Sequence, residues 1–202
     1  MKKILFIIAA LVAMVVAAPQ THDGFFLNSA VGVGYFGLDY NYDTEIRGED
    51  YSETLEYGGS GVQFDFKVGG RVIGNFLLHL SITSIMKRGD VDRSATFAGE
   101  TIKIKDNGLL EEFFLGIGGT YYLPSNVFVT GSFGVADFTL GGNDLESDDG
   151  FAFQIGAGKE WWVSAEWGFG VEVVFMHSKG SNGDGESASA NTLSILFSTT
   201  FN

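Results

Sequence analysis

Eight segments of the chain alternate apolar and polar residues at every second position, and this pattern limits the possible folds more than any other feature. In the first segment, Phe25, Val31 and Val33 fall on one side, while Asn28 and Gly32 fall on the other. Successive side chains of a β-strand point to opposite faces, so this period predicts strands with two unlike faces. The segments begin near Phe25, Val62, Phe76, Phe113, Val127, Phe151, Trp167 and Leu193. Each has close to the roughly 10 residues that a tilted strand needs to cross a bilayer.

The alternation fits two classes of barrel that differ in which face is wet. A soluble barrel turns its apolar face inward, and a barrel in lipid turns it outward. The connections favour the second class, because they alternate between short and long. The short ones span 71–75, 123–126 and 163–166, and the long ones span 38–59, 88–108, 137–150 and 179–190. Short turns on one side and long loops on the other are typical of outer-membrane barrels.

Aromatic residues on the apolar face fall near the ends of the predicted strands. One ring, at the short-turn side, consists of Phe25, Phe76, Tyr121, Trp161, Trp167 and Phe201, and a weaker second ring consists of Tyr35, Phe113, Phe151 and Phe175. Aromatic side chains favour the boundary between hydrocarbon and headgroups, so the first ring predicts an aromatic girdle. The alternative is that these residues are large side chains of an ordinary core.

The polar face carries glycine, serine, threonine and a set of charged residues. The predicted polar network of the lumen comprises Asp65, Lys67, His79, Glu112, Glu160 and Glu172, with Arg71 and Lys87 near the ends. Buried charges are costly unless they are paired, so we expect these groups to pair and close the lumen. The alternative is a gated path for small ions, although eight strands leave little space once side chains fill the interior.

His79 and Ser81 share one face of one strand, which also raises the hypothesis of a lipid hydrolase. A nucleophile needs a base within reach and an accessible oxyanion site, whereas this pair points inward near the short-turn end. We therefore expect a polar pair in the lumen, no enzymatic activity, no catalytic or metal-binding residues and no cofactor.

The first residues predict export. Lys2 and Lys3 precede an apolar stretch that ends in small residues, which is the pattern of a signal peptide cleaved after Ala17. A membrane anchor is the alternative, but the stretch is shorter than a spanning helix requires. We therefore divide the chain into a signal peptide over 1–17 and a barrel over 18–202.

The charge balance and the absence of cysteine exclude some classes of partner and site. Twelve Lys and Arg against 25 Asp and Glu give a net charge of −13, which argues against nucleic acid because phosphate binding needs a basic face. The absence of cysteine excludes disulfides and thiolate metal sites.

Two hairpins carry a resemblance to a known family. The segments GGTYYLPSNVFVTGS (118–132) and GKEWWVS (158–164), with WGFG (167–170), resemble the small OmpA/OmpX-type outer-membrane barrels and the broad family of uncharacterised outer membrane protein beta-barrel domains. The resemblance implies an all-β, eight-stranded antiparallel up-and-down transmembrane β-barrel in a bacterial outer membrane. It also implies contact with outer-membrane lipid and insertion by the barrel-assembly machinery. We expect a monomer.

The predicted loops are acidic. The first carries Asp39, Asp43, Glu45, Glu49, Asp50, Glu53 and Glu56, and the third carries Asp137, Asp144, Glu146, Asp148 and Asp149. Neither has the ligand spacing of an EF-hand, so a solvated acidic surface is expected, with a cationic or cation-bridged partner as the alternative. The sequence thus predicts a structural or surface-interaction role for acidic extracellular loops whose ligand is unknown. A narrow channel for small solutes or ions and an exported, soluble, lipocalin-like ligand-binding barrel are the alternatives.

Overall fold

The computed structural model describes residues 22, 24–141, 145–146, 150–180 and 186–202. They form strands β1 (Phe25–Ile46), β2 (Glu49–Ile73), β3 (Phe76–Phe97), β4 (Glu100–Tyr122), β5 (Val127–Gly141), β6 (Leu145–Glu146), β7 (Gly150–Trp162), β8 (Trp167–Gly180) and β9 (Glu186–Phe201). Within these ranges there is no helix long and apolar enough to cross a membrane. The predicted signal peptide, 1–17, lies outside the described residues.

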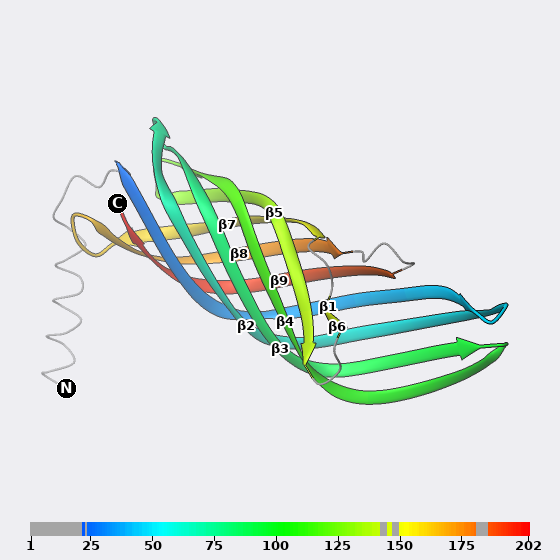
Figure 1. The fold of residues 1–202 in the computed structure, drawn as a ribbon. Coiled ribbons are helices and arrows are strands. Elements are labelled where there is room, and N and C mark those ends of the chain that lie inside the picture. The colour runs from blue at the N-terminus through cyan, green and yellow to red at the C-terminus, as the bar shows by residue number, and fades with distance from the viewer. Residues whose placement is uncertain (1–21, 23, 142–144, 147–149, 181–185) are drawn as a thin grey trace, which may run out of the picture.

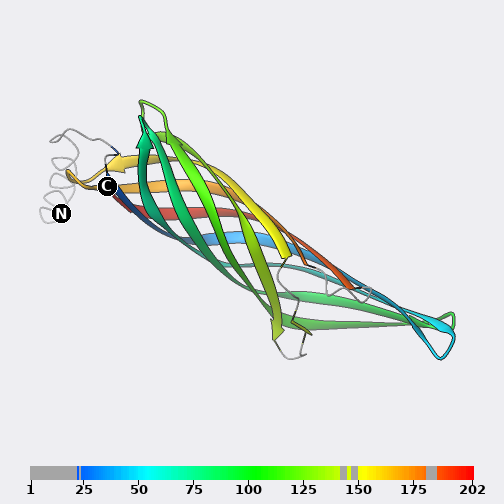
Figure 2. The ribbon, with the colours of Figure 1, turned by 45° about the horizontal axis from the view of Figure 1, so that its top comes forward.

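Eight of the strands close into a ring (Figures 1 and 2). The order around the ring is β4-β3-β2-β1-β9-β8-β7-β5, and β4 pairs with β5 to close it. Every pair is antiparallel, and β6 adds only two residues against the end of β5. The predicted up-and-down barrel of eight antiparallel strands is therefore confirmed. Closure leaves no free sheet edge within the barrel wall, as a membrane-spanning sheet requires.

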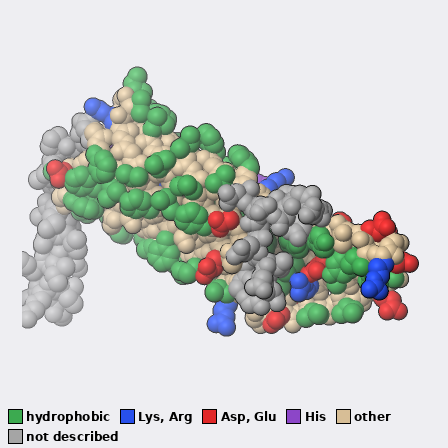
Figure 3. All heavy atoms as spheres, in the orientation of Figure 1, with side chains coloured by type: hydrophobic (Ala, Val, Ile, Leu, Met, Phe, Trp, Pro, Cys, Tyr) green, Lys and Arg blue, Asp and Glu red, His purple; other side chains and the backbone are tan. Residues whose placement is uncertain are grey.

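The apolar face of the barrel points outward. Val33 is 64% exposed and Ile155 is 54% exposed, whereas Gln63, Ser81 and Thr83 on the other face are fully buried. Figure 3 shows hydrophobic side chains over the body of the barrel, with charged side chains gathered at one end. Large apolar side chains in such a continuous belt fit hydrocarbon and not water. The alternative of a lipocalin-like soluble barrel, with its apolar face inside, is therefore wrong.

The strands of the first two hairpins are much longer than predicted. Residues 38–59 are not a loop, because β1 and β2 stay paired in one register from Leu38 opposite Tyr57 to Ile46 opposite Glu49. Residues 88–108 continue β3 and β4 in the same way. The four strands therefore form a projecting sheet, defined here as residues 38–59 and 88–108. Its base still pairs with β9 from Leu38 to Tyr42, and its outer part runs beyond the ends of the other strands (Figures 1 and 2).

Two tight turns close the outer ends of this sheet. The turn between β1 and β2 is Arg47-Gly48, with φ of 56° and 85°, and the turn between β3 and β4 is Ala98-Gly99, with φ of 49° and 83°. Two consecutive positive φ angles are typical of the type I′ turn, whose twist matches that of the flanking strands. Of the other two long connections, 142–144, 147–149 and 181–185 lie outside the described residues. The three predicted short connections are confirmed as short turns.

The interior holds apolar layers as well as polar ones. Phe26, Leu77, Tyr122 and Phe128 form a cluster at the short-turn end, and Ala30, Val174 and Leu196 form a smaller one. Phe36, Ile85, Phe114, Ala136, Ala152 and Met176 form a third. A fourth, at the base of the projecting sheet, consists of Leu38, Leu55, Tyr57, Val91, Leu110, Phe138, Ala188 and Ala190. These clusters leave the lumen filled at several depths, and the prediction of a face made of small and charged residues missed them.

Candidate functional sites: the lumen and the projecting sheet

A charged group crosses the lumen near its middle. The Lys67 ammonium on β2 lies 3.3 Å from both carboxylate oxygens of Glu172 on β8, and 4.0 Å from Asp65. Strands β2 and β8 are three positions apart around the ring, so this ion pair bridges the interior and not two neighbouring strands. Gln63 donates to the other Asp65 oxygen at 2.9 Å. All these residues are at most 3% exposed, which makes their interactions strong and the loss of any one partner costly.

A second ion pair lies closer to the projecting sheet. The Lys87 ammonium on β3 is 3.1 Å from Glu112 on β4, and Ser178 on β8 donates to the same carboxylate. Lys87 also lies 4.9 Å from the ring centre of Phe36, a cation–π geometry. Lys87 is fully buried, deeper than its predicted position near a strand end.

The remaining predicted lumen residues bond to hydroxyl groups. Glu160 accepts a hydrogen bond from the Tyr122 hydroxyl at 2.9 Å. The two ring nitrogens of His79 lie 3.0 Å from Ser81 Oγ and 3.0 Å from Thr120 Oγ1. Ser81 in turn lies 2.8 Å from Ser132, so the His–Ser pair belongs to a buried row of hydroxyls.

The structure thus places all six predicted lumen residues inside the wall but divides them among separate groups. Asp65, Lys67 and Glu172 are together, whereas Glu112, Glu160 and His79 each belong to a different cluster. Arg71 differs from expectation, because its side chain is exposed at the end of β2. Lys67 and Glu172 are 105 residues apart in the chain, and no spacing in the sequence indicates that they meet.

The predicted girdle residues gather at the short-turn end. Phe76 is opposite Tyr121, and Trp167 is opposite Phe201, with their ring centres 5.3 Å apart. Phe25 packs beside Phe201 at 6.5 Å. Trp161 on β7 is exposed to a similar extent as Tyr121 and Trp167. Apolar rings partly exposed at one level suit a membrane boundary.

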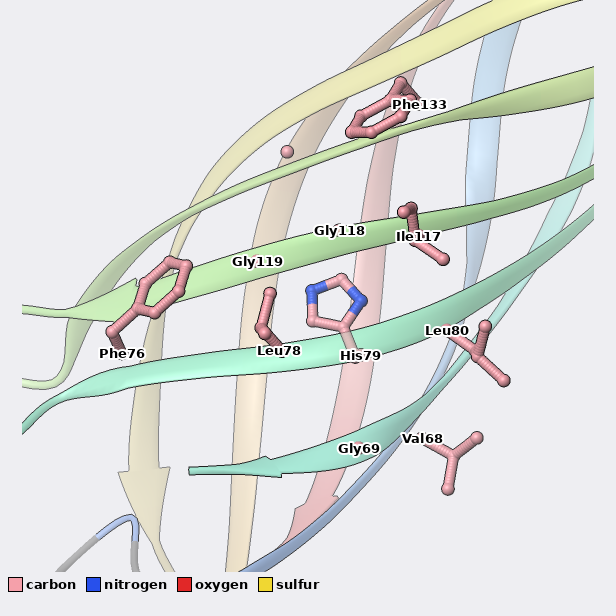
Figure 4. Close-up of a pocket in the computed structure, with 11 residues that line it drawn as sticks. Val68, Gly69, Phe76, Leu78, His79, Leu80, Ile117, Gly118, Gly119 and Phe133 are labelled. Atoms are coloured by element: carbon pink, nitrogen blue, oxygen red, sulfur yellow. The ribbon is translucent and has the colours of Figure 1, made fainter. Parts of the chain in front are cut away.

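The outer face of the barrel is hollowed beside this end (Figure 4). The hollow has a volume of about 590 Å³ and is lined by Val68, Gly69, Phe76, Leu78, His79, Leu80, Ile117, Gly118, Gly119, Gly131 and Phe133. Its glycines leave the wall thin, and a methyl group added at Gly119 would lie 2.7 Å from the Phe76 ring. The hollow lies within the lipid-facing belt, so its lining fits hydrocarbon.

The two faces of the projecting sheet differ: the inner face mixes apolar side chains with an ion pair, and the outer face is polar. On the inner face, which continues the lumen wall, Tyr40, Leu55, Arg93 and Ile104 lie in one row across the four strands. Arg93 also pairs with Glu53 on this face. The neighbouring row belongs to the outer face and consists of Asp39, Glu56, Asp92 and Lys105, all exposed. Polar residues therefore face outward here, the reverse of the arrangement in the membrane belt.

A sequence signal for this sheet was present. Leu38, Tyr40 and Tyr42 alternate with acidic or amide residues, and Arg47-Gly48 stands at the centre of the segment. Period-two alternation around a two-residue turn containing glycine predicts a hairpin. Residues 38–59 were instead predicted to be a long connection between two strands.

Comparisons with known proteins agree with this architecture. No family model matches the sequence, and no curated protein matches it. Among solved structures, the outer membrane protein OprG from Pseudomonas aeruginosa is 14% identical, with a TM-score of 0.51 over 91% of this chain and 98% of that one. Neisserial surface protein A (NspA) is 11% identical, with a TM-score of 0.54 over 89% of this chain and 97% of that one.

This chain has the fold of a small outer-membrane β-barrel. The lipid-facing belt agrees with that fold, and the two together place the barrel in a bacterial outer membrane. At such low identity the likeness establishes the fold and leaves the role of the chain to be argued from its own residues.

Proposed function

We propose that this protein binds a partner at the cell surface through the projecting sheet, with the barrel as a closed anchor. The observation that carries the proposal is a contrast within one molecule. Side chains fill the interior at several depths, while β1–β4 continue past the other strands as an ordered sheet. We include in the proposal a monomer that is surrounded by outer-membrane lipid after insertion by the barrel-assembly machinery.

The closure of the lumen supports an anchor more than a pore. An ion that passed the middle of the barrel would have to displace the Lys67–Glu172 pair, which would leave two buried charges without their partners, a costly state in an interior that excludes water. It would then meet the side chains of Phe36, Phe114 and Met176, which cannot replace its hydration shell.

The geometry of the projecting sheet supports a binding role. Its strands are held by continuous ladders and tight turns, so its exposed side chains are carried by a rigid element and not by a loop. Sites on strands are held more precisely than sites on loops, which lowers the entropy lost on binding.

Trimming both hairpins tests the proposal. One variant joins Asp39 to Glu56 and Asp92 to Lys105, in each case through Asn-Gly, because these residues are already cross-strand neighbours. Full-length and trimmed barrels in lipid nanodiscs are applied to peptide and glycan arrays, and heat-modifiable gel migration verifies that both are folded. We expect array signals that the trimmed barrel loses. Equal binding by the two proteins would overturn the proposal.

A narrow path for small solutes or ions is the second candidate. Three buried polar atoms on the lumen wall, Gln63 Oε1, Ser194 Oγ and Ser198 Oγ, have no hydrogen-bond partner among the described residues, which favours hydration of this wall. Planar-bilayer recording separates the candidates. A stable unitary conductance that changes in Lys67→Gln or Glu172→Gln would support the path and argue against a closed anchor.

A further inference from the structure

One edge of the projecting sheet has no neighbouring strand in the described part of the chain. Residues 100–108 of β4 pair with β3 on one side, through contacts such as Arg93 opposite Ile104. On the other side, β5 begins its pairing with β4 only at Leu109, opposite Gly141. The side chains from Glu100 to Asn107 are all exposed. This stretch is a nine-residue edge strand whose outer row of backbone groups can pair with another strand.

The edge carries a regular chemical pattern. Ile102 and Ile104 lie on the inner face and are 65% and 54% exposed. Lys103 and Lys105 alternate with them on the outer face, and Lys105 is 3.0 Å from Asp92. In a chain with a net charge of −13, these two lysines make a basic strip beside an otherwise acidic face.

We propose that the β4 edge binds an extended segment of a partner protein that pairs as a fifth strand. Main-chain hydrogen bonds would provide affinity, and alternate side chains would provide specificity. Apolar residues of the segment would pack beside Ile102 and Ile104, and acidic residues would lie beside Lys103 and Lys105. This inference rests on the proposed binding role of the projecting sheet and names the chemistry of its partner.

A polar hollow beside the edge adds to this fit. It has a volume of about 320 Å³ and is lined by Thr54, Glu56, Asp92, Arg93, Ser94, Lys103, Ile104 and Lys105. A polar side chain of the added strand that reaches across β4 would find charged groups of both signs there.

The same lysines disfavour a second copy of this chain as the partner. If two β4 edges paired antiparallel about Ile104, Lys103 of one copy would lie directly opposite Lys105 of the other. Like charges directly opposite each other destabilise a strand pair, and edge lysines are a common means of keeping identical sheets apart. The same lysine charges would attract an acidic strand from another protein and so strengthen its binding.

The experiment uses a fluorescent nine-residue peptide of alternating Glu and Val, with the full-length barrel in nanodiscs and fluorescence anisotropy as the readout. We expect saturable binding, reduced at least tenfold by combined Lys103→Glu and Lys105→Glu substitution. Arg47→Glu, at the turn between β1 and β2, makes a charge reversal away from the edge and should leave binding unchanged. A peptide of alternating Lys and Val should show the opposite preference between wild type and the double variant.

Two results would overturn the inference. One is equal binding of the Glu-Val peptide by wild type and the Lys103→Glu, Lys105→Glu variant. The other is undiminished binding of a Glu-Val peptide whose amides are all N-methylated, because such a peptide cannot donate to the ladder from either edge. Either result could occur while trimming the hairpins still removes the array signals. In that case the β4 edge is not the binding site, but the proposal that the projecting sheet binds a partner is retained.

Discussion

The membrane belt and the projecting sheet are built from the same four strands, yet they sort their side chains in opposite ways. Within the belt of β1, Val31 and Val33 face outward; farther along the same face, Asp39 and Asn41 do so. The backbone register continues through both regions without a shift between β1 and β2. The outward residues are therefore apolar where the strand contacts lipid and polar where it contacts water. The hydrogen-bond ladder between the strands is the same in both regions.

The largest effect is expected inside the belt, where a charge has no water to replace a lost partner. Lys67→Met leaves the Glu172 and Asp65 carboxylates buried without their cation. We expect a loss of about 3–5 kcal/mol in the free energy of unfolding, measured by urea titration in lipid vesicles. The double variant Lys67→Met, Glu172→Leu should recover only part of this loss, because Asp65 stays buried without its cation. Equal stability of Lys67→Met and wild type would show that the cross-lumen pair contributes little.

A charge on the outer face gives a direct measure of the contrast between the two regions. Val31→Arg places a cation against hydrocarbon and should cost about 2–4 kcal/mol if it lies near the middle of the bilayer. Asn41→Arg places the same side chain on the same face of the same strand, in water, and should change stability by less than about 0.5 kcal/mol. Similar losses in the two variants, measured by the same titration, would mean that the belt does not end below Asn41.

The contrast between the belt and the projecting sheet also explains which features of the structure the sequence could predict. Alternation predicts the eight strands of the belt because lipid requires apolar side chains at every second position, as at Val31 and Val33. The positions of Lys67 and Glu172 in the apolar–polar alternation place both side chains in the lumen. Their pairing depends on the stagger and tilt of the strands, which the alternation does not predict. Interior residues such as Phe36 were missed because apolar positions were assigned to the lipid face.

Substitutions in the two tight turns should have a smaller effect on stability, and this effect should be limited to the projecting sheet. Gly48 has a φ of 85°, where a residue with a side chain is strained by roughly 1–2 kcal/mol. Gly48→Val should therefore increase amide hydrogen exchange along the outer part of the β1–β2 hairpin. Ala98→Gly, which relieves a positive φ of 49° in the other turn, should slow exchange between β3 and β4. Neither change should alter exchange in the belt; a change there would show that the two regions unfold as one unit.

The smallest effect concerns the junction of the two regions, where Tyr57 is buried at the base of the projecting sheet. Burial, followed by the nearby Asp90 carboxylate, raises the pKa of Tyr57 to about 12. The folded state therefore favours the neutral phenol more than the unfolded state does. This contribution to stability is complete below the ordinary tyrosine pKa of about 10 and is lost as the pH rises through about 12. Tyrosinate absorbance of wild type minus that of Tyr57→Phe should isolate one group that titrates near pH 12. A difference curve centred near pH 10 would mean that water reaches the phenol, and that the apolar cluster does not seal the lumen from the sheet above it.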